Sequence, residues 1–174
     1  MLPKVYAAFK DDGSTHFNLY PGVFKAGPKP QCVEEKACDW EKNTLCVFTL
    51  TANMDGKMAF LHCMDSLDPY SNTAITATKK CVAAAPKVKV NYTDVSACAA
   101  AGGQGDKLLE AAAQRFGHLT RASVPQAFVG TSTVDPDDNP YETILAVLCA
   151  DGSKAKACGG GVHQPVHPSN SSQV

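Results

Sequence analysis

The chain has 174 residues, and its 16 Lys and Arg nearly balance its 17 Asp and Glu, so the formal net charge is −1. A nearly neutral chain argues against nucleic acid as the main partner. No run of about 18 apolar residues is present, so no membrane-spanning helix is predicted. The length predicts one domain, residues 1–158, followed by a Gly-, Pro-, Ser- and His-rich tail, residues 159–174, that is predicted to be disordered.

The front of the chain is predicted to hold little regular structure. Residues 5–9 are predicted to form a short strand, which Lys4 and Lys10 flank. Residues 16–30 are rich in Gly, Pro and aromatic side chains. This composition predicts an extended loop, in which residues 17–20 could pair as a short strand.

The middle of the chain is predicted to be helical, because apolar residues recur there at spacings of three and four. In the second predicted helix Phe60, Cys63, Met64 and Leu67 share one face, so we expect that helix to be deeply buried. Gly and Pro residues mark several of the helix ends. The five predicted helices are residues 39–51, 57–67, 73–85, 93–101 and 107–116.

The last third of the chain predicts a β-hairpin followed by a helix. Residues 126–129 are the first predicted strand, Gly130 is the turn, and residues 131–134 are β-branched enough to pair back. A helix capped by Asn139 follows the hairpin and ends at Gly152.

The chain has eight cysteines, and an even, scattered set predicts a disulfide framework in an oxidising compartment. Eight cysteines allow 105 connectivities, and the sequence does not choose among them. The cysteines are Cys32, Cys38, Cys46, Cys63, Cys81, Cys98, Cys149 and Cys158.

Two acceptor motifs predict N-glycosylation, at Asn91 and at Asn170, and this favours the secretory pathway. The first ten residues, however, lack the apolar core of a signal peptide. Two explanations stay open. Either the front of the chain is absent, or the protein is cytosolic and its cysteines are largely reduced.

Three stretches resemble a known family. The first runs from Cys38 to Cys46 with Asn43 between them, and the second is Phe60-Leu61-His62-Cys63-Met64. The third is Val124-Pro125-Gln126-Ala127-Phe128-Val129-Gly130, followed by Leu148-Cys149. With the placement of Cys81, Cys98 and Cys158, these stretches resemble the gamma-interferon-inducible lysosomal thiol reductases over about residues 4–158.

The resemblance implies a thioredoxin-like α/β fold with a helical insertion in its sheet. It implies a lysosomal or secreted oxidoreductase that acts on disulfide-containing proteins by thiol–disulfide exchange, without a cofactor. In such folds the Val124-Pro125 bond is cis and faces the redox dithiol, where both residues would hold the substrate chain. A trans proline that opens an edge strand is the alternative.

This chain also departs from the family. The family's catalytic Cys-x-x-Cys pair has no counterpart here, since no two cysteines lie three apart. The strand predicted at residues 5–9 resembles the family's second strand, so the N-terminal strand and the catalytic helix would be missing. We therefore expect no catalytic residue, an inactive or truncated family member, and an unpaired, poorly stable sheet edge.

Two alternatives belong to other functional classes. One is a non-catalytic, disulfide-stabilised secreted binding module on the same scaffold. The other is a helical secreted protein unrelated to thioredoxins, which would have no sheet.

Other constellations are better explained as structure. Cys32 and Cys38 could form a redox pair, but five residues separate them, which favours structural disulfides. A zinc-like spacing of Cys and His, a Cys beside a His, and an acidic loop are also present. We predict no zinc site at the first, no catalytic nucleophile at the second and no calcium site at the third. These sets are Cys149, Cys158, His163 and His167; His62 with Cys63; and Asp135, Asp137 and Asp138.

Overall fold

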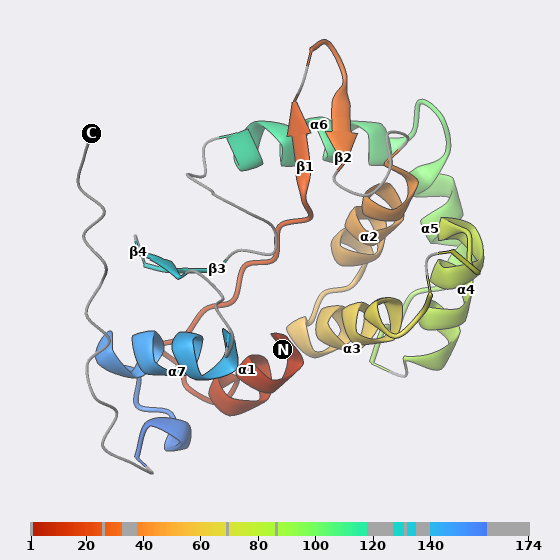
Figure 1. Cartoon of the computed structure of the whole chain (residues 1–174). Helices are drawn as coiled ribbons and strands as arrows, with labels where there is room; N and C mark the ends of the chain where they lie inside the picture. The colour runs from red at the N-terminus through yellow and green to blue at the C-terminus, as the bar shows by residue number, and fades with distance from the viewer. Residues whose placement is uncertain are drawn as a thin grey trace. The chain divides into compact units, whose positions relative to one another are not determined.

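The computed structural model of the chain describes residues 2–25, 27–32, 38–68, 70–85, 87–117, 127–130, 132–134 and 140–159. These residues form a mixed α/β structure that is mostly helical, as the coarse fold class predicted (Figure 1). The chain divides into two compact units. Unit 1 is Met1–Phe17 with Arg121–Val174, and unit 2 is Asn18–Thr120.

Unit 2 contains the five helices that the apolar spacing predicted, with ends shifted by a few residues. They are α2 (Asp39–Leu50), α3 (Met54–Asp65), α4 (Ala74–Ala84), α5 (Tyr92–Ala99) and α6 (Gln104–Gly117). Side-chain caps fix three of the starts, because an oxygen of Asn53, Thr73 or Asn91 accepts a backbone N–H of the first turn.

The main core of unit 2 lies between helices α2 to α5. Phe60 of α3 is fully buried there, as the sequence predicted, and Val47 and Phe48 of α2 belong to the same cluster. The remaining buried members are mostly small, which lets the short helices approach closely. They are Cys46, Met64, Ala77, Cys81, Val82, Ala85, Val88, Val95 and Cys98.

A short hairpin packs beside α6, where the sequence predicted an extended loop with a possible strand at residues 17–20; those four residues form no strand. Strands β1 (Val23–Lys25) and β2 (Pro30–Cys32) pair antiparallel, with Val23 opposite Cys32. Gly27 takes a positive φ of 89° in the turn, which glycine adopts without strain. Val23 is fully buried against Leu109 and Ala113 of α6, so a second, smaller core anchors the hairpin.

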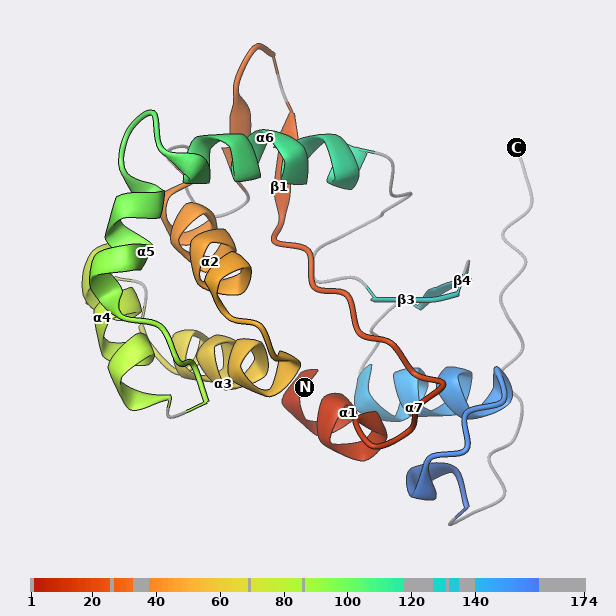
Figure 2. The ribbon, with the colours of Figure 1, turned by 180° about the vertical axis from the view of Figure 1, so that it is seen from behind.

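The first element of unit 1 corrects a prediction. Residues 5–9 were expected as a strand, but they belong to helix α1 (Leu2–Phe9). Val5 and Phe9 are four residues apart, so a helix brings both to one face, where they are buried against Ile144 and Leu145. Both views show α1 beside the helix that carries those two residues (Figures 1 and 2).

The predicted β-hairpin and final helix of unit 1 are present in the described residues. Strands β3 (Ala127–Val129) and β4 (Ser132–Val134) pair antiparallel around Gly130, whose φ is 58°. Helix α7 (Pro140–Ala150) follows, and a short 3-10 helix, η1 (Lys156–Cys158), lies beyond it. Predicted residues 126, 131 and 139 lie outside the described part of the chain.

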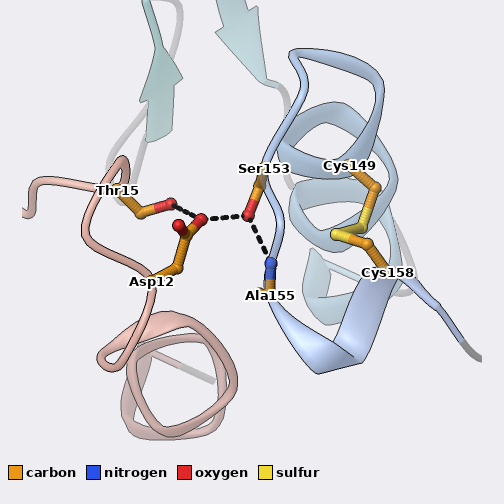
Figure 3. Close-up of a disulfide and its surroundings, with 6 residues drawn as sticks. All are labelled: Asp12, Thr15, Cys149, Ser153, Ala155 and Cys158. Carbon is orange, nitrogen blue, oxygen red and sulfur yellow. Dashed lines mark hydrogen bonds between the residues drawn. A yellow bond between two sulfur atoms is a disulfide. The ribbon is translucent and has the colours of Figure 1, made fainter.

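A hydrogen-bond cluster around Asp12 ties the segment after α1 to the segment after α7 (Figure 3). The Asp12 carboxylate accepts from the hydroxyls of Ser153 (2.5 Å), Ser14 (2.8 Å) and Thr15 (2.9 Å). These donors, the Ser153 hydroxyl first, hold the pKa of Asp12 far below its usual range.

Candidate functional site

All eight cysteines are paired, in four disulfides, and this confirms the predicted disulfide framework. The pairs are Cys32–Cys38, Cys46–Cys98, Cys63–Cys81 and Cys149–Cys158, with Cα–Cα distances of 5.2, 5.9, 5.5 and 5.3 Å. These distances are usual for disulfides. No free thiol is left on the chain.

Two of the disulfides hold helices of unit 2 together. Cys46–Cys98 joins α2 to α5, and Cys63–Cys81 joins α3 to α4. Cys46 and Cys81 are fully buried within the main core. An attacking thiolate reaches such buried sulfurs only through local unfolding, which favours a structural role for both bonds.

The third disulfide lies in unit 1, close to the Asp12 cluster. Cys149–Cys158 joins the end of α7 to η1 (Figure 3). Gly152 takes a φ of 91° just after α7, so the chain reverses direction there, and Ser153 follows it into the hydrogen bond with Asp12. Both cysteines are half-buried.

The fourth disulfide is the one that joins a strand to a helix start. Cys32 ends β2, and Cys38 immediately precedes Asp39, the first residue of α2. Cys38 adopts a left-handed backbone conformation with φ 58°, which is uncommon for a residue other than glycine. Only 6% of Cys32 and 2% of Cys38 is exposed, so this pair is also enclosed.

Glu41 lies next to this fourth disulfide. One carboxylate oxygen of Glu41 and the two sulfurs of Cys32 and Cys38 all lie within 4.8 Å of one another. Cys38 and Glu41 are three residues apart, so the first turn of α2 brings them to one face. The sequence analysis missed Glu41, although this helical spacing between a cysteine and a carboxylate could have indicated it.

Two ion pairs hold the elements that carry this site. Lys42 of α2 contacts Asp106 of α6 at 2.8 Å, and Lys25 of β1 contacts Glu110 of α6. The Lys42 ammonium lowers the pKa of Asp106, and the Lys25 ammonium lowers the pKa of Glu110. Helix α6 therefore positions both the hairpin with Cys32 and the helix that follows Cys38.

The other predicted site residues are scattered. Asn91 is exposed at the start of α5. His62 is exposed, and its neighbour Cys63 is bonded to Cys81, which argues against a Cys/His nucleophile. The remaining candidates lie outside the described residues; they are Val124, Pro125, Asp135, Asp137, Asp138, His163, His167 and Asn170.

Comparisons of this chain with protein-family models, with curated proteins and with solved structures found no match. Among the residues that the structure describes, no helix is both long and apolar enough to cross a bilayer.

Proposed function

We propose that this chain is a non-catalytic, disulfide-stabilised binding module related to the lysosomal thiol reductases. It works in an oxidising compartment, either the lysosome or the extracellular space, and its partners are disulfide-containing proteins. Val124 and Pro125 would contribute to the surface that holds the partner chain. A thioredoxin-like arrangement of the hairpin β3–β4 and helix α7 is part of this proposal.

The observation that carries the proposal is the pairing of every cysteine. Disulfide reduction needs a thiolate that attacks a disulfide sulfur and a second thiol that resolves the mixed disulfide. In the chain with four intrachain disulfides no thiol is free to act as either one, and no two cysteines lie three apart to form a Cys-x-x-Cys pair. Three of these bonds lie inside unit 2, where they stabilise a small core that is poor in large side chains.

Two measurements on the purified full chain test the proposal. We expect no free thiols by thiol titration in denaturant, and no turnover in an insulin-reduction assay at pH 5 with a small thiol as the electron donor. A family member with an intact Cys-x-x-Cys pair serves as the positive control. Turnover by this chain above the donor-only rate would contradict the proposal.

A second candidate function is disulfide reduction by the Cys32–Cys38 pair itself. The position of Cys38 at the start of α2 favours it, because the positive end of a helix stabilises a thiolate. Asp39 and Glu41 in the same turn act in the opposite direction. If insulin is turned over, the Cys32→Ser/Cys38→Ser variant should abolish the activity, and Cys149→Ser/Cys158→Ser should leave it unchanged.

A further inference from the structure

We propose that Cys32, Cys38 and Glu41 form a zinc site when the Cys32–Cys38 disulfide is reduced, and that re-oxidation releases the metal. This inference does not rest on the proposed family, because it uses only the local geometry. The proposed ligand is a thiophilic divalent cation. A disulfide-stabilised scaffold does not by itself need such a ligand.

The three ligand atoms are already gathered. Their mutual distances of at most 4.8 Å leave room for a central ion with Zn–S bonds of about 2.3 Å and a Zn–O bond of about 2.1 Å. Only the distance between the two sulfurs must increase, from that of an S–S bond to that of two atoms in non-bonded contact. Two thiolates and one carboxylate leave a fourth tetrahedral position for a water molecule or another exchangeable ligand.

Regular elements supply all three ligands. Cys32 ends β2, which β1 holds in register, and Cys38 and Glu41 lie one helical turn apart at the start of α2. The ion pairs from α6 to Lys25 and Lys42 fix both elements. Because the scaffold does not depend on the Cys32–Cys38 bond alone, breaking that bond leaves the ligands near one another.

The charges around the pair favour a cation over free thiolates. Asp39 and Glu41 both lie in the first turn of α2, and the Glu41 carboxylate lies within 4.8 Å of both sulfurs. Negative neighbours disfavour a bare thiolate, and a second thiolate beside the first adds to the repulsion. A divalent ion reverses this balance, because each negative group then faces a positive charge.

The redox step is balanced by a small thiol of the glutathione class, which reaches this enclosed bond when the structure opens locally. Two molecules of this thiol are oxidised to their disulfide and give two electrons and two protons to the Cys32–Cys38 bond, which breaks into two thiols. Zinc then replaces both thiol protons, which pass to solvent. Oxidation runs the sequence in reverse, forms the sulfur–sulfur bond again and expels the ion.

The test uses the full chain, reduced with a phosphine that does not hold zinc tightly, with alkylation and mass spectrometry to identify the free thiols. Zinc binding is measured by chelator competition, and cobalt(II) is added separately to look for a thiolate-to-metal charge-transfer band. We expect one zinc per chain when Cys32 and Cys38 are free, none when they are bonded, and release on re-oxidation.

Variants separate coordination from general charge. Cys32→Ser/Cys38→Ser should abolish binding and the cobalt band, and Glu41→Gln should weaken zinc binding by about 10-fold or more. Asp39→Asn, which changes a nearby charge but removes no ligand, should have a much smaller effect. Cys149→Ser/Cys158→Ser should still bind one zinc, which excludes those thiols as the source.

Three results would overturn the proposal. A folded chain with alkylatable Cys32 and Cys38 that binds no zinc is the first. The second is that the parent chain, the Glu41→Gln variant and the Cys32→Ser/Cys38→Ser variant all bind zinc with equal affinity. The third is loss of the near-ultraviolet circular dichroism as soon as this bond is reduced, because the site then has no folded scaffold.

Discussion

At the residue scale, Asp12 is a carboxyl whose charged form the fold favours. Its carboxylate accepts hydrogen bonds from three hydroxyls, and one of them, Ser153, lies 141 residues further along the chain. These bonds favour the charged form, so the pKa of Asp12 lies below its value in the unfolded chain. The charged carboxylate of Asp12 therefore links the segment after α1 to the segment after α7.

The sign of this shift gives a prediction on pH. A carboxyl whose pKa is lowered by folding stabilises the fold above its unfolded pKa, about 3.9, and this contribution is lost as the pH falls through the folded pKa. Asp12→Asn should therefore lower the melting temperature equally at pH 7 and pH 5, and by progressively less as the pH falls below about 3.9.

Thermal melts followed by circular dichroism measure this effect. Asp11→Asn is the matched control, because it removes the same charge from an exposed neighbour outside the hydrogen-bond cluster. If both variants melt alike at pH 7, the cluster does not stabilise unit 1.

At the scale of single elements, the start of α5 connects local structure to the predicted modification. The Asn91 side chain caps the helix by accepting the Asp94 N–H at 2.9 Å, and its amide nitrogen donates to the Asp94 carboxylate. A glycan on that nitrogen leaves the oxygen and one N–H in place, so capping and glycosylation are compatible.

Two variants separate the sugar from the cap. In a chain fused to a secretion signal, with Asn170→Gln as background, we expect a mass that an N-glycosidase lowers. Thr93→Ala should lose the sugar and keep the cap, while Asn91→Ala should lose both and about 1 kcal/mol of stability. An unglycosylated secreted parent chain would argue against the predicted modification of Asn91.

The elements also show how far the sequence could predict this structure. The five helices of unit 2, the β3–β4 hairpin and α7 were predicted, because apolar spacing, caps and Gly130 all indicated the same structure there. The prediction for residues 5–9 was wrong, because a five-residue segment with Val5 and Phe9 fits either period and only packing against α7 decides. The hairpin β1–β2 was missed, since three-residue strands beside Gly and Pro give no alternating pattern.

The candidate site was harder to predict than the helices. The sequence established that the cysteines pair, but connectivity depends on which helices pack together, and short segments do not encode that. The helical spacing from Cys38 could have indicated Glu41, but its approach to Cys32 depends on the β1–β2 hairpin, which the sequence did not predict. The proposed substrate-holding residues Val124 and Pro125 stay a prediction.

At the scale of the whole molecule, each unit has its own core and its own disulfides. Unit 2 has three, including Cys46–Cys98 across 52 residues, and unit 1 has Cys149–Cys158 across 9. In the chain-entropy description, these two bonds stabilise by about 4 and about 2.6 kcal/mol. Two units with separate cores do not need to unfold together.

We therefore expect calorimetry of the full chain to show two transitions. Cys149→Ser/Cys158→Ser should lower one of them and leave the other in place, whereas Cys46→Ser/Cys98→Ser should lower the other. A single transition that both variants shift as a whole would mean that the chain unfolds as one body.

The division of the chain also sets an order of events on the ribosome. Unit 2 is one continuous segment, whereas unit 1 draws on both ends of the chain. Helix α1 is synthesised before unit 2, yet α7, which covers Val5 and Phe9, is made only after all of unit 2. During that interval these two apolar side chains lack their native partners. A chaperone that recognises short apolar helices would bind α1 at this stage.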